Sequence, residues 1–378
     1  MDSREAYIVM NLLPRVGPVR ARQLIAACGS PEGVLQADRA RLIALDGVGP
    51  AIAEAIADWR RLADLDRELA DCREAGVQIL TPADDAFPAV LDGLRDGPLA
   101  LYVRGELDAL RPTPDQALAV VGSRRMTLYG EKAVGTLVEP AARAGWVIVS
   151  GLARGIDTEA HRATLRADGC TIAVIAGGLN HVTPRENHRL AADICRCGGA
   201  LVSEQPLNAA PDKRAFPMRN RLIAALAQGT LVVEAGPASG SLITARRARD
   251  YGRPVFAVPG RIDAPGSRGC NELIADGANL VQRLDDLLSA LTFLPGFSCP
   301  PPPQTERVTV GADSEPPALG LSDVERTVCE QLAAGEAAID ELSRYCDQPV
   351  HELLTVMLGL EMKCVVQRCP GGRYALRK

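Results

Sequence analysis

The sequence predicts an α/β protein built around a doubly wound, mainly parallel β-sheet. Short runs rich in β-branched residues alternate with helical stretches between residues 117 and 258. These runs are continuously apolar rather than alternating, which is typical of parallel strands covered by helices on both faces of the sheet. We expect the strands at residues 117–121, 146–150, 170–175, 200–203, 230–234 and 254–258.

The length and composition predict a folded chain of more than one domain. With 378 residues, 47% of them hydrophobic and 24% charged, the chain exceeds what one hydrophobic core usually holds. The first residues do not resemble a secretory signal and no apolar run reaches about 18–20 residues, so we expect a cytoplasmic protein outside the membrane. The 11 cysteines are scattered and odd in number, which favours reduced thiols over a disulfide framework.

The charge is distributed unevenly along the chain. The net charge is −5, but residues 117–290 hold 21 Lys and Arg against 16 Asp and Glu. The flanking segments are both acidic, with 13 against 19 in residues 1–116 and 8 against 12 in residues 291–378. A basic middle segment suits a nucleic-acid partner, which the whole-chain sum conceals.

Glycine hairpins and prolines divide the chain. We expect a helical domain, a sheet domain, a proline-rich linker and a winged-helix domain at residues 1–72, 73–293, 294–320 and 321–378. In the first, Leu13–Pro18 and Leu45–Pro50 each precede a helix and resemble a helix-hairpin-helix or a SAM-like domain. Hairpin amides can hold a DNA phosphate, but the acidic composition favours packing or protein contacts at least equally.

The C-terminal segment predicts a winged helix, with three helices at residues 323–333, 339–345 and 349–362 followed by two strands around a Pro-Gly-Gly turn. The third helix carries Glu352 and Glu361 and no arginine, which is poorly suited to the major groove of DNA. A protein-interaction or regulatory role is the favoured interpretation.

The loops that follow the strands are the expected site of function, because ligands of doubly wound sheets bind beyond the carboxyl ends of the strands. Gly and Ser dominate these loops, at residues 122–125, 151–157, 177–180 and 235–244. Such residues let backbone amides approach a phosphate, and the following helix N-terminus adds positive potential. For Gly177-Gly178 a purely steric turn explains the glycines equally well.

Nucleotide cofactors are not expected, since no G-x-G-x-x-G follows the first strand and no G-x-x-x-x-G-K-[ST] occurs. Metal sites and catalytic residues are not expected either. Asp157 and His161 are four residues apart, but Asp157 is more simply interpreted as a helix cap. No Cys/His set has the spacing of a zinc site.

Residues 212–221 combine four cations with one aromatic ring, Phe216, before a helix. Guanidinium groups bind phosphates and an aromatic ring can stack on a base, as in single-strand binding. The alternative is a solvated basic turn with Phe216 buried in the core.

Six ordered motifs resemble the bacterial DNA-processing protein A family (DprA/Smf). They are VVGSRR at 120–125, VSGLARGIDTEAH at 149–161, PRENHRL at 184–190, FPMRNRLIA at 216–224, SGSLITARRA at 239–248 and VFAVPG at 255–260. The resemblance is strong over residues 75–293 and weaker in the flanking helical segments. It implies an extended Rossmann-like sheet in a homodimeric, non-catalytic protein. Such a protein binds and protects incoming single-stranded DNA (ssDNA) and helps to load the recombinase RecA in natural transformation.

The resemblance also implies which residues bind DNA, motif by motif. The phosphate contacts of the first two loops would come from Gly122, Ser123, Arg124, Arg125, Ser150, Gly151 and Arg154. The basic segment would supply a phosphate and a base contact through Lys213 and Phe216, beside Arg219 and Asn220. The last loop would add Ser239, Gly240, Ser241 and Thr244.

Two alternative functions belong to other classes. A related fold cleaves nucleotides as a phosphoribohydrolase, and Glu234 follows a strand here, but the P-G-G-x-G-T-x-x-E motif of those enzymes is absent. A transcriptional regulator that uses the winged helix is less favoured because that segment is acidic.

Overall fold

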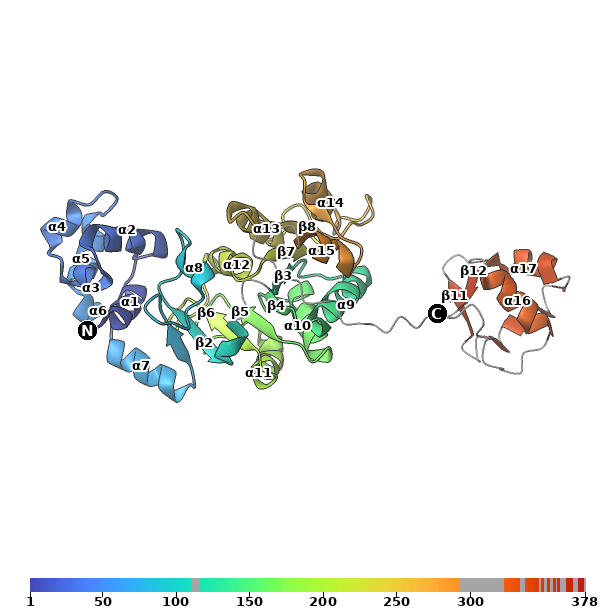
Figure 1. Ribbon diagram of the computed structural model, residues 1–378, viewed down its shortest axis with the longest axis horizontal. Coiled ribbons are helices and arrows are strands. Elements are labelled where there is room, and N and C mark those ends of the chain that lie inside the picture. Colours follow the sequence, from blue (N-terminus) through green and yellow to red (C-terminus); the bar gives the residue numbers. More distant parts are fainter. Residues whose placement is uncertain are drawn as a thin grey trace. The chain divides into compact units, whose positions relative to one another are not determined.

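The computed structural model describes residues 1–110, 116–291 and, with gaps, 323–376 (Figure 1). The chain divides into two compact units, Met1–Pro303 and Gln304–Lys378. The expected proline-rich linker at 294–320 lies outside the described residues.

The first unit is built on a nine-stranded sheet with the order β1-β2-β6-β5-β4-β3-β7-β8-β9. The strands are β1 (Gln78–Leu80), β2 (Leu101–Gly105), β3 (Ala117–Val121), β4 (Val147–Ser150), β5 (Thr171–Val174), β6 (Ala200–Ser203), β7 (Gly229–Val232), β8 (Val255–Ala257) and β9 (Asn279–Leu280). All neighbours from β6 to β9 are parallel, whereas β1 and β2 are antiparallel additions at one edge. The predicted α/β class with a mainly parallel sheet is therefore confirmed.

The six expected strands are present: two have the expected ends, and the ends of the other four differ by one or two residues. The chain order runs outward from β3 to β6 on one side and from β7 to β9 on the other, so the direction of winding reverses between β3 and β7. This switch point is where the two flanking loops diverge and leave a crevice. The strands β1, β2 and β9, at the two ends of the sheet order, were not predicted, because short strands outside the regular strand–helix repeat give little pattern.

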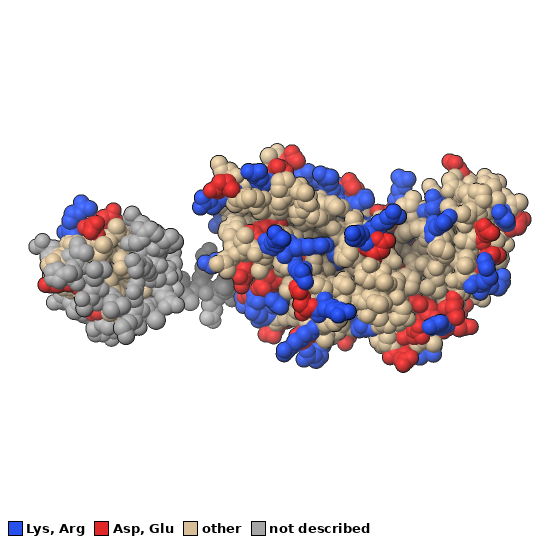
Figure 2. All heavy atoms as spheres, turned by 180° about the vertical axis from the view of Figure 1, so that it is seen from behind, with Lys and Arg blue, Asp and Glu red and all other residues tan. Residues whose placement is uncertain are grey.

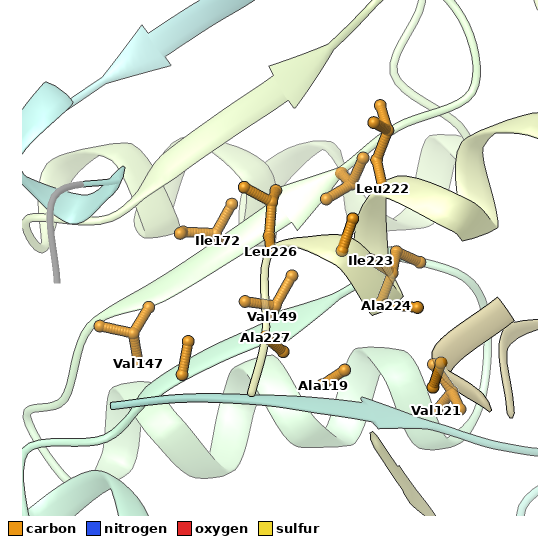
Figure 3. Packing of buried hydrophobic residues seen from close by; sticks show 14 of the residues in the cluster. Ala119, Val121, Val147, Val149, Ile172, Leu222, Ile223, Ala224, Leu226 and Ala227 are labelled. Carbon is orange, nitrogen blue, oxygen red and sulfur yellow. The ribbon is translucent and has the colours of Figure 1, made fainter. Parts of the chain in front are cut away.

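Helices cover both faces of the sheet. They are α9 (Leu128–Arg143), α10 (Ile156–Arg166), α11 (His188–Arg196), α12 (Ala215–Ala225), α13 (Ser241–Asp250), α14 (Arg268–Ala275) and α15 (Leu284–Leu291), with a short α8 (Ala89–Asp92). Successive residues of β3 point to opposite faces: Ala119 packs with α12 and α13, whereas Val120 packs with α9 and α10. Figure 3 shows Leu222, Ile223 and Leu226 of the α12 segment above the strands, so that the C-terminal half of α12 is anchored in the core.

Seven helices precede the sheet: α1 (Ser3–Leu12), α2 (Pro18–Cys28), α3 (Pro31–Gln36), α4 (Arg39–Ile43), α5 (Pro50–Ala57), α6 (Trp59–Leu62) and α7 (Leu65–Glu74). Two hairpins, before α2 and α5, each place a residue in the left-handed region, Arg15 at φ 68° and Gly47 at φ 77°. Helices α1 and α7 share a hydrophobic core with the sheet, since Ile8 and Cys72 cluster with Tyr102 of β2 and Leu201 of β6. This region therefore packs into the same compact unit as the sheet.

The second unit contains α16 (Asp323–Ala333), α17 (Ile339–Cys346) and a three-stranded sheet of order β10-β12-β11. The strands are β10 (Ala337–Ala338), β11 (Val366–Cys369) and β12 (Arg373–Leu376). Val328, Leu342, Leu353 and Tyr374 form its core. The expected helix at 349–362 is described only in part, and the Pro-Gly-Gly turn lies outside the described residues. Among the helices that the structure describes, none is long and apolar enough to cross a bilayer.

Candidate nucleic-acid interface

An open cavity of about 850 Å³ lies at the switch point between β3 and β7. The loops that follow these strands and the N-terminal turn of α12 surround it. Twelve of the predicted site residues line it: Gly122, Ser123, Arg124, Arg125, Lys213, Phe216, Arg219, Asn220, Ser239, Gly240, Ser241 and Thr244. Residues of three separate motifs, with Lys213 just before the second, thus meet at one place, although they span residues 122 to 244 of the chain.

Two helices begin at this cavity without a side-chain cap. The N-cap residues, Arg214 of α12 and Gly240 of α13, make no side-chain capping hydrogen bond, and neither helix has an acidic residue in its first turn. Residues of both first turns, including Phe216 and Ser241, line the cavity. The Arg214 amide donates to Asp212 Oδ1 at 2.7 Å and the Ser241 amide donates to Ser239 Oγ at 3.4 Å. The positive ends of the two helices, rather than free amides, therefore favour an anion here.

Glycine allows the first loop to lie close to its neighbours. A Cβ atom at Gly122 would lie 2.6 Å from the Ile156 side chain and 3.0 Å from the carbonyl oxygen of Glu234. The Ser123 hydroxyl folds the loop back on itself, accepting from the Arg125 amide and donating to the Arg125 carbonyl oxygen, both at 3.0 Å. The loop is thus rigid and leaves the Arg124 and Arg125 side chains exposed.

Three cations at the cavity are available to a ligand. Arg124, Arg125 and Lys213 are exposed, and no carboxylate of the described chain lies within ion-pairing distance of any of them. The Arg124 guanidinium lies over the Phe216 ring, 5.6 Å from its centroid. In the face shown in Figure 2, Lys and Arg spread across the middle of the first unit. This positive charge is suited to phosphate oxygens.

Arg219, in contrast, is 5% exposed and serves the scaffold below the cavity. Its Nη1 donates to the carbonyl oxygens of Gly151, at 2.6 Å, and Val174, and its Nε donates to Asn220 Oδ1 at 3.2 Å. Burial lowers the pKa of the Arg219 guanidinium to about 10, although Asp157 opposes this shift. The charge is retained at neutral pH, while its hydrogen bonds hold the ends of two strands together.

Asp157 is not a helix cap, so that interpretation was wrong. The N-cap of α10 is Gly155, at φ 77°, where a side chain would be strained. The Asp157 carboxylate instead accepts from the Gly151 amide at 3.1 Å and lies beside the Arg219 guanidinium. Burial raises the pKa of Asp157, and the arginine counteracts that effect. Asp157 therefore fixes the loop after β4.

The structure separates three predicted residues from the main cavity. Ser150 is fully buried and its hydroxyl donates to the Val120 carbonyl oxygen at 2.6 Å, so it is not available to a ligand. Gly151 and Arg154 line an adjoining cavity of about 300 Å³. Arg154 is engaged in a two-pronged ion pair with Glu186, at 2.8 Å for both contacts, which raises its pKa.

The glycine loop after β5 has a packing role. A Cβ atom at Gly178 would clash with the carbonyl oxygens of Pro206 and Leu207. The Gly178 amide donates to the Ala209 carbonyl oxygen at 2.8 Å. The steric interpretation of Gly177-Gly178 is thus the one that the structure supports.

Glu234 also has structural partners. Its carboxylate accepts from the Thr127 amide at 3.0 Å and from the Thr127 hydroxyl, which holds the start of α9 against the end of β7. The buried His161 contacts Thr171 Oγ1 through Nδ1 at 2.7 Å. Within the described ranges, no group of three or more His, Cys, Asp or Glu is arranged to hold a metal.

Comparison with known proteins decides the family. The model of the family described as DNA recombination-mediator protein A matches residues 78–292. Protein Smf of Escherichia coli is 43% identical over 300 residues, which covers 79% of this chain and 78% of the relative. The chain belongs to the DNA recombination-mediator protein A family.

Solved structures of this family agree with the fold. DNA processing protein A from Streptococcus pneumoniae aligns with a TM-score of 0.63 and 35% identity, covering 76% of this chain and 98% of that one. The Helicobacter pylori protein, described by its single-stranded DNA binding mode, aligns with a TM-score of 0.51 and 32% identity over 57% of this chain and 95% of that one. A DprA winged helix domain matches residues 312–372, and a SAM-like helix-hairpin-helix tandem matches residues 11–61.

Sequence reasoning missed part of the cavity wall of this family member. Pro237, Ala238, Pro217 and Ala153 also line the cavity, contributing backbone and small apolar surface. Each lies within or next to a loop that the sequence singled out. Their types carry no chemical signal, so only the position of the loops could have indicated them.

Proposed function

We propose that this protein is a non-catalytic ssDNA-binding protein that protects processed or incoming DNA and helps to load RecA. The observation that carries the proposal is the cavity at the β3/β7 switch point. It combines three cations that have no carboxylate partner in the described part of the chain with two helices whose N-cap residues make no side-chain capping bond. Asp157, the one carboxylate among its lining residues, is buried. Such a site favours polyanions over neutral ligands.

A chain of phosphates suits the site better than a single nucleotide. The amide-rich loops after β3 and β7 and the Lys213 turn are spread around an open cavity rather than gathered into one phosphate loop. The sequence has only 13 aromatic residues, 2 Trp, 6 Tyr and 5 Phe, so stacking contributes little beyond Phe216. Affinity is therefore mainly electrostatic and sensitive to salt.

The residues have distinct roles in this proposal. Arg124, Arg125 and Lys213 bind phosphates through their side chains, and Phe216 contacts a base. The loop residues bind phosphate through backbone amides and hydroxyls, namely Gly122, Ser123, Ser239, Gly240, Ser241 and Thr244. Arg219, Ser150 and Asp157 hold these loops in place.

A non-enzymatic protein is the favoured interpretation. Both oxygens of Glu234, the carboxylate that a nucleotide-cleaving enzyme would require, are engaged by Thr127. Glu234 is not among the residues that line the cavity. Release of free base from a nucleoside monophosphate, lost in Glu234→Gln, would contradict this part of the proposal.

The test compares binding of a 30-nucleotide ssDNA and of the corresponding duplex by fluorescence anisotropy. We expect ssDNA to bind more tightly, and equal or tighter binding of the duplex would contradict the proposal. Static light scattering tests the expected homodimer, which has twice the 40.1 kDa chain mass. Faster RecA assembly on ssDNA coated with single-strand-binding protein tests the loading step, and an unchanged rate would refute that step alone.

A further inference from the structure

We propose that the N-terminal helical region positions Lys213 and Phe216 for ssDNA. It does so through three side chains, Asn11, Glu68 and Asp71, that hold the loop preceding α12. The inference rests on the proposed ssDNA function, and it adds positioning residues that lie outside the cavity.

The loop at residues 204–214 connects β6 to α12 and contains no helix or strand. No regular ladder of backbone hydrogen bonds therefore determines its path, and its shape depends on contacts with neighbouring elements. Because Lys213 lies at its end and Phe216 in the first turn of α12, the path of the loop determines where both side chains begin.

One side of the loop is held by α1 and α7. Three hydrogen bonds make this contact: Asn11 Nδ2 donates to the Glu204 carbonyl oxygen at 3.0 Å, the Leu207 amide donates to Glu68 Oε1 at 2.8 Å, and Asn208 Nδ2 donates to Asp71 Oδ2 at 3.1 Å. Leu207 is fully buried in the core shared with these helices. Its amide depends on the Glu68 carboxylate as its acceptor.

The opposite side of the loop lies against the glycine loop after β5. The Asn180 amide donates to the Leu207 carbonyl oxygen at 3.2 Å, and the Gly178 amide donates to Ala209. A Cβ atom at Gly177 would lie 3.1 Å from the Pro211 ring, so Pro211 also packs there. The loop is thus fixed on two sides as far as Pro211, two residues before Lys213.

Glu68 lies in the first turn of α7, near the buried Tyr102 side chain, whose pKa is raised by burial first and by Glu68 second. Helix α7 begins at an Asp64 N-cap that accepts from the Arg67 amide at 3.1 Å, which fixes the turn that carries Glu68. A carboxylate in the first turn of a capped helix is a suitable acceptor for the amide of a loop.

Without the Glu68 and Asp71 carboxylates, one side of the loop loses two of its three hydrogen bonds and the loop becomes mobile. Binding of DNA must then also order the Lys213 and Phe216 side chains, which lowers the affinity. We expect Glu68→Ala/Asp71→Ala to weaken ssDNA affinity about fivefold, the cost of ordering roughly two side chains. Long-range electrostatics alone predicts the opposite sign, since the variant removes two negative charges from a DNA-binding protein. The direction of the change therefore distinguishes positioning from charge.

The matched control is Asp66→Ala/Glu74→Ala on the same helix. Both residues are exposed, and the change in charge is identical. We expect the control to bind ssDNA as tightly as the wild type or slightly more tightly. The amide pair Glu68→Gln/Asp71→Asn keeps an acceptor oxygen at each position, so it should restore affinity. A change of the same direction and size in the two alanine pairs would overturn the proposal.

A second measurement excludes a general loss of stability. In a Lys213→Ala/Phe216→Ala background, the Glu68→Ala/Asp71→Ala pair should have no further effect on affinity, whereas partial unfolding would weaken both backgrounds equally. If wild-type protein fails to bind ssDNA, the proposed function is wrong. If it binds ssDNA but the Glu68/Asp71 variant is unaffected, only the positioning role is wrong.

Discussion

The salt dependence of ssDNA binding should show how many phosphates the three cations of the cavity, Arg124, Arg125 and Lys213, contact. Each phosphate contact on a single strand contributes a slope of about 0.7 to the plot of log affinity against log salt concentration. Arg124, Arg125 and Lys213 therefore account for a slope of about 2. Arg124→Ala/Lys213→Ala should reduce the slope by about 1.4. At low salt the lost charge-assisted hydrogen bonds, about 1.5 kcal/mol each, should weaken binding about 100-fold.

The control variant is Arg143→Ala/Arg261→Ala, which removes the same charge. Neither residue lines the cavity, and each forms an ion pair: Arg143 with Glu139 at 3.3 Å, and Arg261 with Asp263 at 2.7 Å. Fluorescence anisotropy titrations between about 50 and 300 mM salt give the slope for each protein. The slope of the control should match the wild type. Equal slopes for all three proteins, or an equal drop in both variants, would refute the assignment of these cations to phosphates.

Three further predictions concern stability. Burial lowers the pKa of His161 in the folded protein to about 3, whereas the pKa of a histidine in the unfolded chain is 6.5. As the pH falls below 6.5, the unfolded chain therefore binds a proton that the folded protein does not. The free energy of unfolding decreases over this range. We expect a loss of about 2 kcal/mol between pH 6.5 and 5 by urea unfolding, and an unchanged slope in His161→Asn would contradict it. Leu226→Ala leaves a cavity in the core shown in Figure 3 and should lower the free energy of unfolding by about 3 kcal/mol. A decrease below about 1 kcal/mol would show instead that the core collapses around the cavity. Gly178→Ala should lower the melting temperature because its Cβ atom meets two carbonyl oxygens, whereas Gly135→Ala, with no atom within 4 Å, should raise it slightly.

The central part of the fold could be predicted because every strand from β3 to β8 is a continuous apolar run between helices. The same pattern located the loops after β3 and β7, from which Gly122 and Ser239 line the same cavity. It could not reveal β1 and β2, because β2 depends on antiparallel pairing with β6, a distant segment, and β1 depends on pairing with β2. Nor could it show that α1 and α7 share a core with the sheet, since a helix face indicates burial but not its partner.

The candidate site was harder to predict because its polar residues serve two opposite purposes. Ser150 and Arg219 were predicted to bind DNA, yet their polar atoms are engaged by backbone groups that hold the loops. Arg124 and Lys213 are cationic like Arg219 and lie in loops, but they remain exposed and have no carboxylate partner in the described chain. Burial distinguishes the residues that hold the loops from those available to a ligand. Because burial depends on contacts between distant segments, it cannot be read from a local motif.

Substitutions of the buried residues and of the exposed residues at the cavity should have different effects on stability and on ssDNA binding. Replacing Arg219 removes a buried donor that two carbonyl oxygens share, and it leaves the Asp157 carboxylate without its neighbouring charge. An unpaired buried charge costs far more than a lost surface contact, so Arg219→Ala should destabilise the fold by about 3 kcal/mol or more. Arg124→Ala should leave the free energy of unfolding within about 0.5 kcal/mol of the wild type while weakening ssDNA binding. Urea unfolding and anisotropy on the two variants measure both quantities, and a destabilised Arg124→Ala protein would contradict the separation of scaffold from ligand contacts.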